Sequence, residues 1–398
     1  MTTQVPPVDD LDWRPRALAY AEGLVGELGD PAWQQMLATV PRHLFVPSFW
    51  DLDEFNSPAD LVCGEDPDQR ETWLDAVYSD RFLVTQWAPG TGPGGIPIRI
   101  VTSSASEPSL VATMLDRLHV AGGHRVLEIG TGTGYNAALL CVRVGADLVT
   151  SIDVDPVLVD AAAHRLTAAG HRPQLHVGDG AAALPGDAAF DRIIATCSVR
   201  RIPPTWITQL ATSGRLVAPL GFGGALAVLD KTSEVEVTGR IDASPVYFMP
   251  LRDAAERPLP QDFAPPVPAT EPAAAHHGCS DVDPAELDGR DFQLWLALHH
   301  PALQLTHNYR DGAPTAAIVH TTRQRAIAAL APSSDGLWPV TQQNGRPWDT
   351  VESAWRAFVR TGRPGRGRLG LTARSDGHQH LWLDHPDSVY TWPVPERI

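Results

Sequence analysis

A glycine-rich turn followed by a single acid carries the clearest chemistry in this sequence. The stretch VLEIGTGTGY (126–135) ends an apolar run in three glycines at alternate positions, and Asp153 closes the next apolar run. Glycines let the backbone approach a ligand closely, and the free N–H groups of a helix start face that ligand. A carboxylate at the end of the second strand can accept both hydroxyls of a ribose. The pattern therefore indicates a nucleoside-binding site.

The glycine spacing narrows the choice of ligand. The turn reads Gly-x-Gly-x-Gly rather than the Gly-x-Gly-x-x-Gly of a dinucleotide fold. Glu128, just before the turn, would also repel a pyrophosphate. A nucleoside that bears an amino acid suits the site better, so we expect S-adenosylmethionine as the cofactor. The alternative is an ordinary glycine turn of an α/β domain.

A second short motif, VGDG (177–180), lies one strand–helix unit after Asp153. Asp179 can accept the exocyclic amine of adenine, while Gly180 leaves room for the ring. Alone, Gly-Asp-Gly is an ordinary turn. Its place after Asp153 favours an adenine contact.

The third candidate precedes the glycine turn, in the segment TSSASEP (102–108). Ser106 fits the N-cap position of a helix, with Glu107 and Pro108 in the first turn. A plain capping serine is one interpretation. The other is that the Ser106 hydroxyl and the free N–H groups of this helix start hold a substrate carboxylate.

These motifs need a sheet to position them, and the pattern of residues 98–250 supplies one. Near-continuous apolar strands separated by amphipathic helices predict a mostly parallel sheet covered on both faces. Ligands bind beyond the carboxyl ends of such strands. The expected strands are 98–102, 124–129, 148–153, 173–177, 191–196 and 214–219, with helices at 108–118, 135–144, 156–168 and 204–212 and an antiparallel edge at 225–230 and 234–241.

The rest of the chain surrounds this α/β unit. Six prolines in residues 258–272 mark a linker, and a helix over 351–361 and a β-hairpin over 368–384 indicate a further α+β part. Residues 51–70 read as an acidic, irregular insertion, and residues 87–97, rich in glycine and proline, as a loop. The predicted division is a helical N-terminal segment (1–80), the cofactor domain (81–250), a Pro-rich linker (251–272) and a C-terminal α+β substrate-recognition domain (273–398).

Composition excludes several classes of partner. A formal net charge of −16 argues against nucleic-acid binding, which needs a basic surface. No apolar run is long enough for a membrane span, and the N-terminus lacks the pattern of a signal peptide, so we expect a cytoplasmic protein. The four cysteines form no Cys-x-x-Cys and are expected to be reduced thiols; no histidine pair has metal-ligand spacing, so no metal site is expected.

Seven blocks together resemble one family. In order along the chain they are VPRHLFVP (40–47), YSD (78–80), Ser106-x-Pro108, VLEIGTGTGY (126–135), GDG (178–180), FDRIIAT (190–196) and IPPTWITQLATSGRLVAPLG (202–221). They closely resemble protein-L-isoaspartate O-methyltransferases, over roughly residues 12–250.

This resemblance implies a Rossmann-like class I methyltransferase sheet and assigns site residues. Ser106 falls on the family's Ser-x-Pro serine, and Asp80 of the YSD block is the second catalytic residue that we expect. The expected cofactor contacts are Ser104, Glu128, Gly130, Gly132, Gly134, Asp153, Asp179 and Gly180, and the expected substrate contacts are Ser106, Val199, Arg363 and Arg366.

Three departures from the family pattern bear on the substrate. Ser-Glu-Pro replaces the usual Ser-Ala-Pro, the segments 51–70 and 87–97 are longer, and residues 273–398 have no counterpart in the compact repair enzymes. The extended architecture resembles the methyltransferases that modify an aspartate of ribosomally made peptides, whose ester closes to an aspartimide. A dedicated peptide substrate is therefore our first expectation. General isoaspartate repair is the alternative, and a small-molecule methyltransferase the alternative of another class.

The chemistry itself asks little of the side chains. An aspartyl carboxylate, with a reference pKa of about 4, is already ionised at neutral pH, so methyl transfer needs no general base. Ser106 is expected to orient that carboxylate rather than to act as a nucleophile. Arg360, Arg363, Arg366 and Arg368 cluster near the C-terminal helix and could pair with an acidic peptide, although a solvated loop is the alternative.

Overall fold

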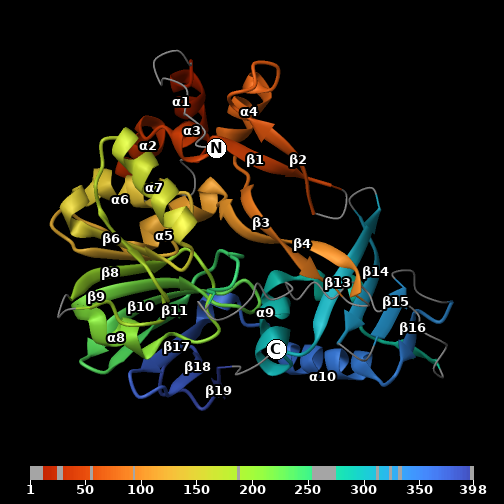
Figure 1. Cartoon of the computed structure of the whole chain (residues 1–398). Helices are drawn as coiled ribbons and strands as arrows, with labels where there is room; N and C mark the ends of the chain where they lie inside the picture. The colour runs from red at the N-terminus through yellow and green to blue at the C-terminus, as the bar shows by residue number, and fades with distance from the viewer. Residues whose placement is uncertain are drawn as a thin grey trace.

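The computed structural model describes most of the chain (Figure 1). The described residues are 12–24, 30–53, 57–92, 95–185, 189–252, 275–310, 313–321, 325–329 and 334–394. Of the predicted linker over 251–272, residues 253–272 lie outside these ranges. No helix in the described part of the chain is long and apolar enough to cross a membrane.

A ten-stranded mixed sheet forms the centre of the molecule, and it confirms the predicted α/β fold. Its first five strands in the chain are parallel to one another, and each of the next five is antiparallel to its neighbours. In spatial order the strands are β19 (Thr391–Pro393), β18 (Gln379–Leu383), β17 (Leu369–Arg374), β11 (Glu236–Ile241), β10 (Leu226–Ser233), β9 (Leu210–Pro219), β8 (Phe190–Ala195), β5 (Val126–Ile129), β6 (Val149–Asp153) and β7 (Gln174–Val177).

The strand order reverses beside β5. The chain runs from β5 outward to β6 and β7, whereas β8 returns to the other side of β5. Ile129 consequently pairs with Ile152 of β6 and with Ala195 of β8. The carboxyl ends of β5 and β8 therefore flank a topological switch point, which is where open α/β sheets bind ligands.

Helices cover both faces of this sheet, as the sequence predicts. Helices α5 (Pro108–Leu118), α6 (Tyr135–Val144) and α7 (Pro156–Ala168) pack on one face, where their apolar residues share a core with alternate strand residues such as Val126 and Val149. The opposite strand residues, including Leu127 and Ile193, pack with α8 (Pro204–Gln209) and α9 (Arg290–His299). Figure 1 shows α5, α6 and α7 gathered beside β6 and β8.

The N-terminal part combines short helices with a four-stranded antiparallel sheet, and two predictions are wrong here. Residues 51–70 contribute to a hairpin, and residues 87–91 belong to a strand rather than to a loop. Pro89 is tolerated because, beyond Val84, β3 pairs with β4 alone, so a proline needs no hydrogen bond on its open side. The elements are α1 (Arg14–Gly23), α2 (Pro31–Thr39), α3 (Arg42–Phe45), β1 (Ser48–Leu52), β2 (Pro58–Cys63), α4 (Arg70–Val77), β3 (Leu83–Thr91) and β4 (Pro97–Ala105), with sheet order β2-β1-β3-β4.

The C-terminal part holds a third sheet of five antiparallel strands, in the order β12-β16-β15-β14-β13. Helix α9 joins this sheet to the central one, because Leu294 and Leu298 lie in the central core while Phe292 and Trp295 lie in the C-terminal core. The elements are β12 (His276–Ser280), β13 (Gln304–Arg310), β14 (Ala313–His320), β15 (Arg325–Ala329), β16 (Trp338–Gln343) and α10 (Pro347–Arg360).

The last three strands correct the predicted domain division. The expected hairpin over 368–384 is present as β17 and β18, but β17 pairs with β11 over five residue pairs. Strands β10 and β11 are antiparallel as predicted, yet they do not form an edge. Residues 369–393 thus extend the cofactor-domain sheet rather than belonging to a separate C-terminal unit.

Candidate functional site

The glycine turn lies at the carboxyl end of β5, next to the end of β8. Gly130, Gly132 and Gly134 all have positive φ angles, of 96°, 51° and 89°. A Cβ atom on Gly130 would lie 2.7 Å from Thr196 Oγ1, and one on Gly134 would lie 3.1 Å from the Ala162 side chain. The backbone conformation and the close contacts together restrict these positions to glycine.

Asp153 is tied to the glycine turn by backbone hydrogen bonds. The Gly132 N–H donates to its Oδ2 at 2.9 Å, and the Asp155 N–H donates to its Oδ1 at 3.1 Å. The side chain is only half-buried. Because an ionised carboxylate offers about four acceptor sites, room remains on both oxygens for the hydroxyls of a ribose.

Glu128 does not face the site, which corrects its prediction as a cofactor contact. Its side chain has no exposed surface, and it accepts hydrogen bonds from Asn136 Nδ2 at 2.7 Å and from Ser151 Oγ at 2.5 Å. The Ser151 hydroxyl also pairs with Thr131 Oγ1 at 2.6 Å. Burial raises the pKa of Glu128 to about 7. Glu128 therefore supports the turn from behind, because its strand position points it toward α6.

Asp179 and Gly180 follow β7 and approach the same edge of the sheet. The Ala181 N–H donates to Asp179 Oδ1 at 2.8 Å, and no described residue donates to its Oδ2. Gly180 is required for packing rather than to leave room for a ring. A Cβ there would lie 2.6 Å from the Ile129 side chain, and Trp206 Nε1 donates to the Gly180 carbonyl at 2.7 Å.

This donor and acceptor set fits S-adenosylmethionine. Asp153 supplies acceptors for the ribose, and the free oxygen of Asp179 supplies one for an exocyclic amine. The three positive-φ glycines carry no side chains, so a ligand can approach the backbone of the turn at these positions.

Ser106 lies just before α5 but does not cap it, contrary to the prediction. The N-cap residue is Glu107, and Pro108 is the first helical residue, so Ser106 stands one position earlier. Glu107 Oε1 accepts a hydrogen bond from Ser109 Oγ at 3.1 Å, which turns this carboxylate back onto its own helix. The Ser106 hydroxyl does not cap α5, and its role in holding a substrate stays a prediction.

Asp80 occupies the helix start that was expected to bind an anion. The Ser109 N–H donates to Asp80 Oδ1 at 2.9 Å. Since Pro108 has no N–H group, Asp80 takes the first backbone donor of α5. The prediction that free N–H groups of this helix hold the substrate is therefore wrong for Ser109. Ser106 and Asp80 are nonetheless brought to the same end of α5.

Ser103 rather than Ser104 points toward the glycine turn. Consecutive strand residues point to opposite faces, and Ser103 Oγ lies 3.9 Å from where a Gly132 Cβ would be. Ser103 also accepts a hydrogen bond from Thr85 Oγ1 at 3.1 Å. Ser103 is thus the serine beside the turn, and the cofactor contact predicted for Ser104 stays a prediction.

Two of the predicted substrate residues serve the fold. Val199 is buried, and its backbone N–H donates at 2.9 Å to the carbonyl of Pro219, the last residue of β9. Arg366 is 3 % exposed and donates to the carbonyls of Gly224 at 3.1 Å and Arg290 at 2.7 Å, so it cannot reach a peptide.

The other arginines of the cluster are largely paired. Arg363 forms an ion pair with Glu286 at 3.2 Å, and Arg368 forms one with Asp384 at 2.8 Å. Each guanidinium is therefore already bound to a carboxylate of this chain. The arginine-patch hypothesis is corrected for Arg366 and weakened for Arg368.

Sequence reasoning missed several side chains that hold these loops. Gln86 Nε2 donates to Asp155 Oδ2 at 3.0 Å, and Gln86 Oε1 accepts from Thr102 Oγ1 at 2.7 Å, so β3 is tied to the loop after β6. Thr196 Oγ1 donates to the Gly130 carbonyl at 2.6 Å. The position of Thr196 directly after an apolar strand is a usable signal, whereas Gln86 stands in a segment that reads as a loop.

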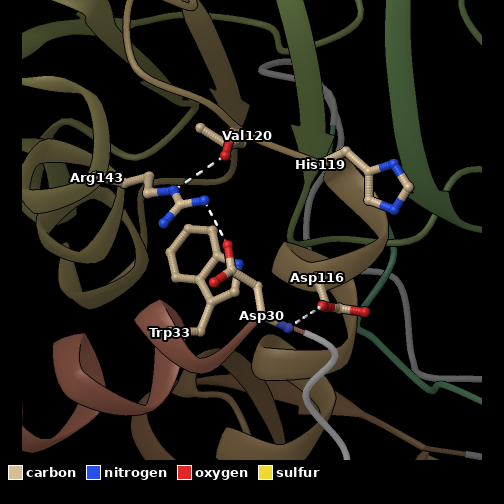
Figure 2. A pocket seen from close by; sticks show the side chains of 6 residues that line it. All are labelled: Asp30, Trp33, Asp116, His119, Val120 and Arg143. Carbon is tan, nitrogen blue, oxygen red and sulfur yellow. Dashed lines mark hydrogen bonds and ion pairs between the residues drawn. The ribbon is translucent and has the colours of Figure 1, made fainter.

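A separate cavity of about 450 Å³ lies away from this site (Figure 2). It is placed at the C-terminal ends of α5 and α6, and its charged groups satisfy one another, since Arg143 donates to Asp30 at 2.5 Å and to the Val120 carbonyl at 3.0 Å. We assign the chemistry to the carboxyl edge of the sheet and not to this cavity. Its lining residues are Asp30, Trp33, Asp116, His119, Val120 and Arg143.

Comparison with known proteins points to one family. The profile described as "Protein-L-isoaspartate(D-aspartate) O-methyltransferase (PCMT)" matches residues 81–256. A protein-L-isoaspartate O-methyltransferase 1 of Anaeromyxobacter sp. is 42 % identical over 155 residues, which cover 38 % of this chain and 72 % of the relative. A protein-L-isoaspartate O-methyltransferase of Methanoculleus marisnigri is 33 % identical over 228 residues, covering 56 % of this chain and 84 % of that protein.

Solved structures give more distant matches. A structure titled protein-L-isoaspartate O-methyltransferase has a TM-score of 0.48 at 19 % identity and covers 94 % of this chain and 100 % of its own. A protein described as a putative enzyme of the same name from Plasmodium falciparum, in complex with S-adenosyl-L-homocysteine, has a TM-score of 0.43 at 16 % identity and covers 59 % and 98 %.

Proposed function

Because the chain belongs to the protein-L-isoaspartate O-methyltransferase family and uses S-adenosylmethionine, we propose that it methylates an aspartyl or isoaspartyl carboxylate of a peptide at the start of α5. The observation that carries the proposal is the meeting of two sets of residues. Ser103, near the end of β4, lies against the glycine turn, and Ser106 is the first residue after β4. A carboxylate held at Ser106 is then next to the cofactor loop.

The described side chains suggest a division of roles. Asp153 holds the ribose hydroxyls, Asp179 the adenine amine, and Gly132 keeps the turn open. S-adenosylmethionine, when bound, supplies a methyl group on a positively charged sulfur. Ser106 donates a hydrogen bond to one carboxylate oxygen and leaves the other oxygen to accept the methyl group.

No proton has to move before this reaction. The acceptor carboxylate is ionised at neutral pH, so the reaction requires no general base. The rate then depends mainly on holding two partners in line, which can contribute on the order of 7–11 kcal/mol. The residues that fix Ser106 and the glycine turn are therefore as important as the residues that touch substrate.

The product determines the next step. The carbonyl of a methyl ester is a better electrophile than a carboxylate, so the following backbone nitrogen of the peptide can attack it. The new N–C bond closes a five-membered succinimide, the C–OCH3 bond breaks, and methoxide leaves as methanol with the proton from that nitrogen. This step asks for no further enzyme group.

Two peptide classes fit this chemistry, and we propose a dedicated peptide as the first. The dedicated peptide is supported by the residues beyond 256, which the family profile does not match. In this part of the chain, α9 packs on the central sheet and β17 adds to it. General repair of isoaspartyl proteins is the second candidate, since repair enzymes of this name share the cofactor domain.

Mass spectrometry of matched peptides tests the proposal. Two synthetic peptides with one sequence, carrying Asp in one and isoaspartate in the other, are incubated with enzyme and cofactor, together with any small peptide encoded beside this gene. A gain of one methylene, or a net loss of water after methanol leaves, identifies the substrate. Modification of the isoaspartyl peptide alone favours repair, and modification of the encoded peptide alone favours the dedicated role. No modification of any of the three would refute peptide carboxyl methylation and leave a small-molecule substrate.

A further inference from the structure

Arg42 is a buried cation in the VPRHLFVP block (40–47), to which the sequence assigns no chemical role. It lies in the short helix α3, and its side chain has no exposed surface. Its Nη1 donates to the carbonyls of Val77 at 2.5 Å and Ser79 at 3.2 Å. Its Nη2 donates to the carbonyls of Arg81 at 3.4 Å and Ser106 at 3.0 Å.

These four carbonyls belong to the two segments that carry the candidate catalytic residues. Ser79 and Arg81 stand on either side of Asp80, and the fourth carbonyl is that of Ser106 itself. The Asp80 carboxylate in turn accepts from the Ser109 N–H at 2.9 Å, which closes a loop of contacts around the start of α5. One guanidinium therefore sets the distance between the Asp80 segment and the Ser106 segment.

Arg42 also reaches the cofactor side. Its guanidinium carbon lies 5.8 Å from the centre of the Tyr135 ring, and Tyr135 is the first residue of α6, directly after Gly134. Three segments of the site thus contact the same side chain. A planar guanidinium with donors in fixed directions can hold several carbonyls at once, which an ammonium group cannot do in the same way.

The charge of Arg42 is unusual as well. The hydrogen bonds of its guanidinium to the described residues all go to carbonyl oxygens, and its Nε has no hydrogen-bond partner among those residues. Burying an unpaired cation is costly, and here only carbonyl dipoles and aromatic rings compensate it. A positive charge next to Ser106 favours an anion at that position.

We propose that Arg42 is a positioning residue for methyl transfer: it fixes the segments of Asp80 and Ser106, and through them the acceptor carboxylate. This inference rests on the proposed function. Because the Arg42 side chain has no exposed surface, it acts through the residues that it holds and through its charge, and not by contact with a ligand.

A purely structural role is the competing explanation, and Arg143 provides a matched control. Arg143 also crosslinks distant segments, since it bonds the Val120 carbonyl and Asp30, and it stacks on Trp33. It does so at the opposite ends of α5 and α6 from the candidate site (Figure 2). Loss of Arg143 should therefore affect stability without affecting the geometry at Ser106.

The experiment compares Arg42→Met, Arg42→Lys and Arg143→Met with the full-length enzyme. Methyl transfer to the peptide substrate is measured for kcat and KM, cofactor affinity by calorimetry with S-adenosylhomocysteine, and stability by thermal unfolding. We expect Arg42→Met to lower kcat/KM for the peptide by about tenfold to a hundredfold, with cofactor affinity changed by less than about threefold. Arg42→Lys should recover part of the loss, and Arg143→Met should keep kcat/KM within about twofold.

The outcomes separate the two hypotheses. A folded Arg42→Met enzyme with wild-type kcat/KM, or an equal loss in Arg143→Met, would overturn the positioning role while leaving the proposed function intact. A wild-type enzyme that modifies no peptide would remove the proposed function and this inference with it.

If Arg42→Met does not fold, the decisive comparison is Arg42→Lys with and without Ser106→Ala. If Arg42 acts through Ser106, the two losses in kcat/KM are not additive. Additive losses would overturn the inference.

Discussion

The buried carboxylate of Glu128 should make the stability of this fold depend on pH. Burial raises the pKa of Glu128 to about 7 from an ordinary value of 4.5, although hydrogen bonds from Ser151 and Asn136 favour the charged form. Since one pKa unit corresponds to about 1.4 kcal/mol, the difference is worth roughly 3 kcal/mol of unfolding free energy. A carboxyl group whose pKa is higher in the folded state stabilises the fold fully below the unfolded pKa. That contribution is lost as the pH rises from about 4.5 to about 7.

Glu128→Gln tests this reasoning, because glutamine resembles the protonated carboxyl and does not ionise. Unfolding by urea is measured for both proteins at pH 5 and pH 8. Relative to the wild type, the variant should gain about 2 kcal/mol or more between these two pH values. Ser151→Ala supplies the opposite control: it removes a hydrogen bond that favours the ionised carboxylate, so the loss of stability with pH should become steeper. Parallel pH profiles for wild type and Glu128→Gln would refute the argument.

Three further predictions follow from the site and the sheet. Asp153→Ala should weaken S-adenosylmethionine binding, measured by calorimetry, by roughly tenfold to a hundredfold, since hydrogen bonds to a charged group are worth about 1.5–3 kcal/mol. The control is Asp191→Ala, at the amino end of β8, which removes the acceptor of the Arg125 N–H and should leave cofactor affinity unchanged. Gly130→Ala, at φ 96° and with a Cβ 2.7 Å from Thr196 Oγ1, should lower both stability and cofactor affinity, and an unchanged melting temperature would contradict the strained turn. Truncation after residue 256 should expose the edge of β11 that β17 covers and cause aggregation in size-exclusion chromatography, whereas a soluble monomer with full cofactor affinity would show that β17–β19 are dispensable.

Local signals in the sequence predict the helices around the site with the bounds observed. Helices α5, α6 and α7 begin and end at the expected residues because apolar periodicity coincides with proline or glycine at their starts and with positive-φ residues at or near several of their ends. The glycine turn and Asp153 likewise lie together because both follow adjacent parallel strands. These features depend on neighbours in the chain.

What the sequence does not predict depends on distant contacts. The pairing of β17 with β11 joins residues separated by more than a hundred positions, and nothing local in either strand specifies it. Residues 87–91 form a strand although they contain Pro89 and Gly90, because β4 pairs with one side only. Arg42 lies in the VPRHLFVP block without a role that the sequence assigns, and only the fold brings four carbonyls around it.

The central claim is that a peptide carboxylate is held by Ser106 beside the cofactor loop, and one measurement tests it most directly. Transfer of labelled methyl groups from S-adenosylmethionine to the peptide substrate is followed for wild type and Ser106→Ala, with cofactor affinity measured on the same samples. Because one hydrogen bond to a charged oxygen is lost, kcat/KM for the peptide should fall by about tenfold to a hundredfold. Cofactor affinity should stay within about twofold, since Ser106 has no part in that contact. Full activity in Ser106→Ala, or an equal loss of cofactor binding, would contradict this assignment.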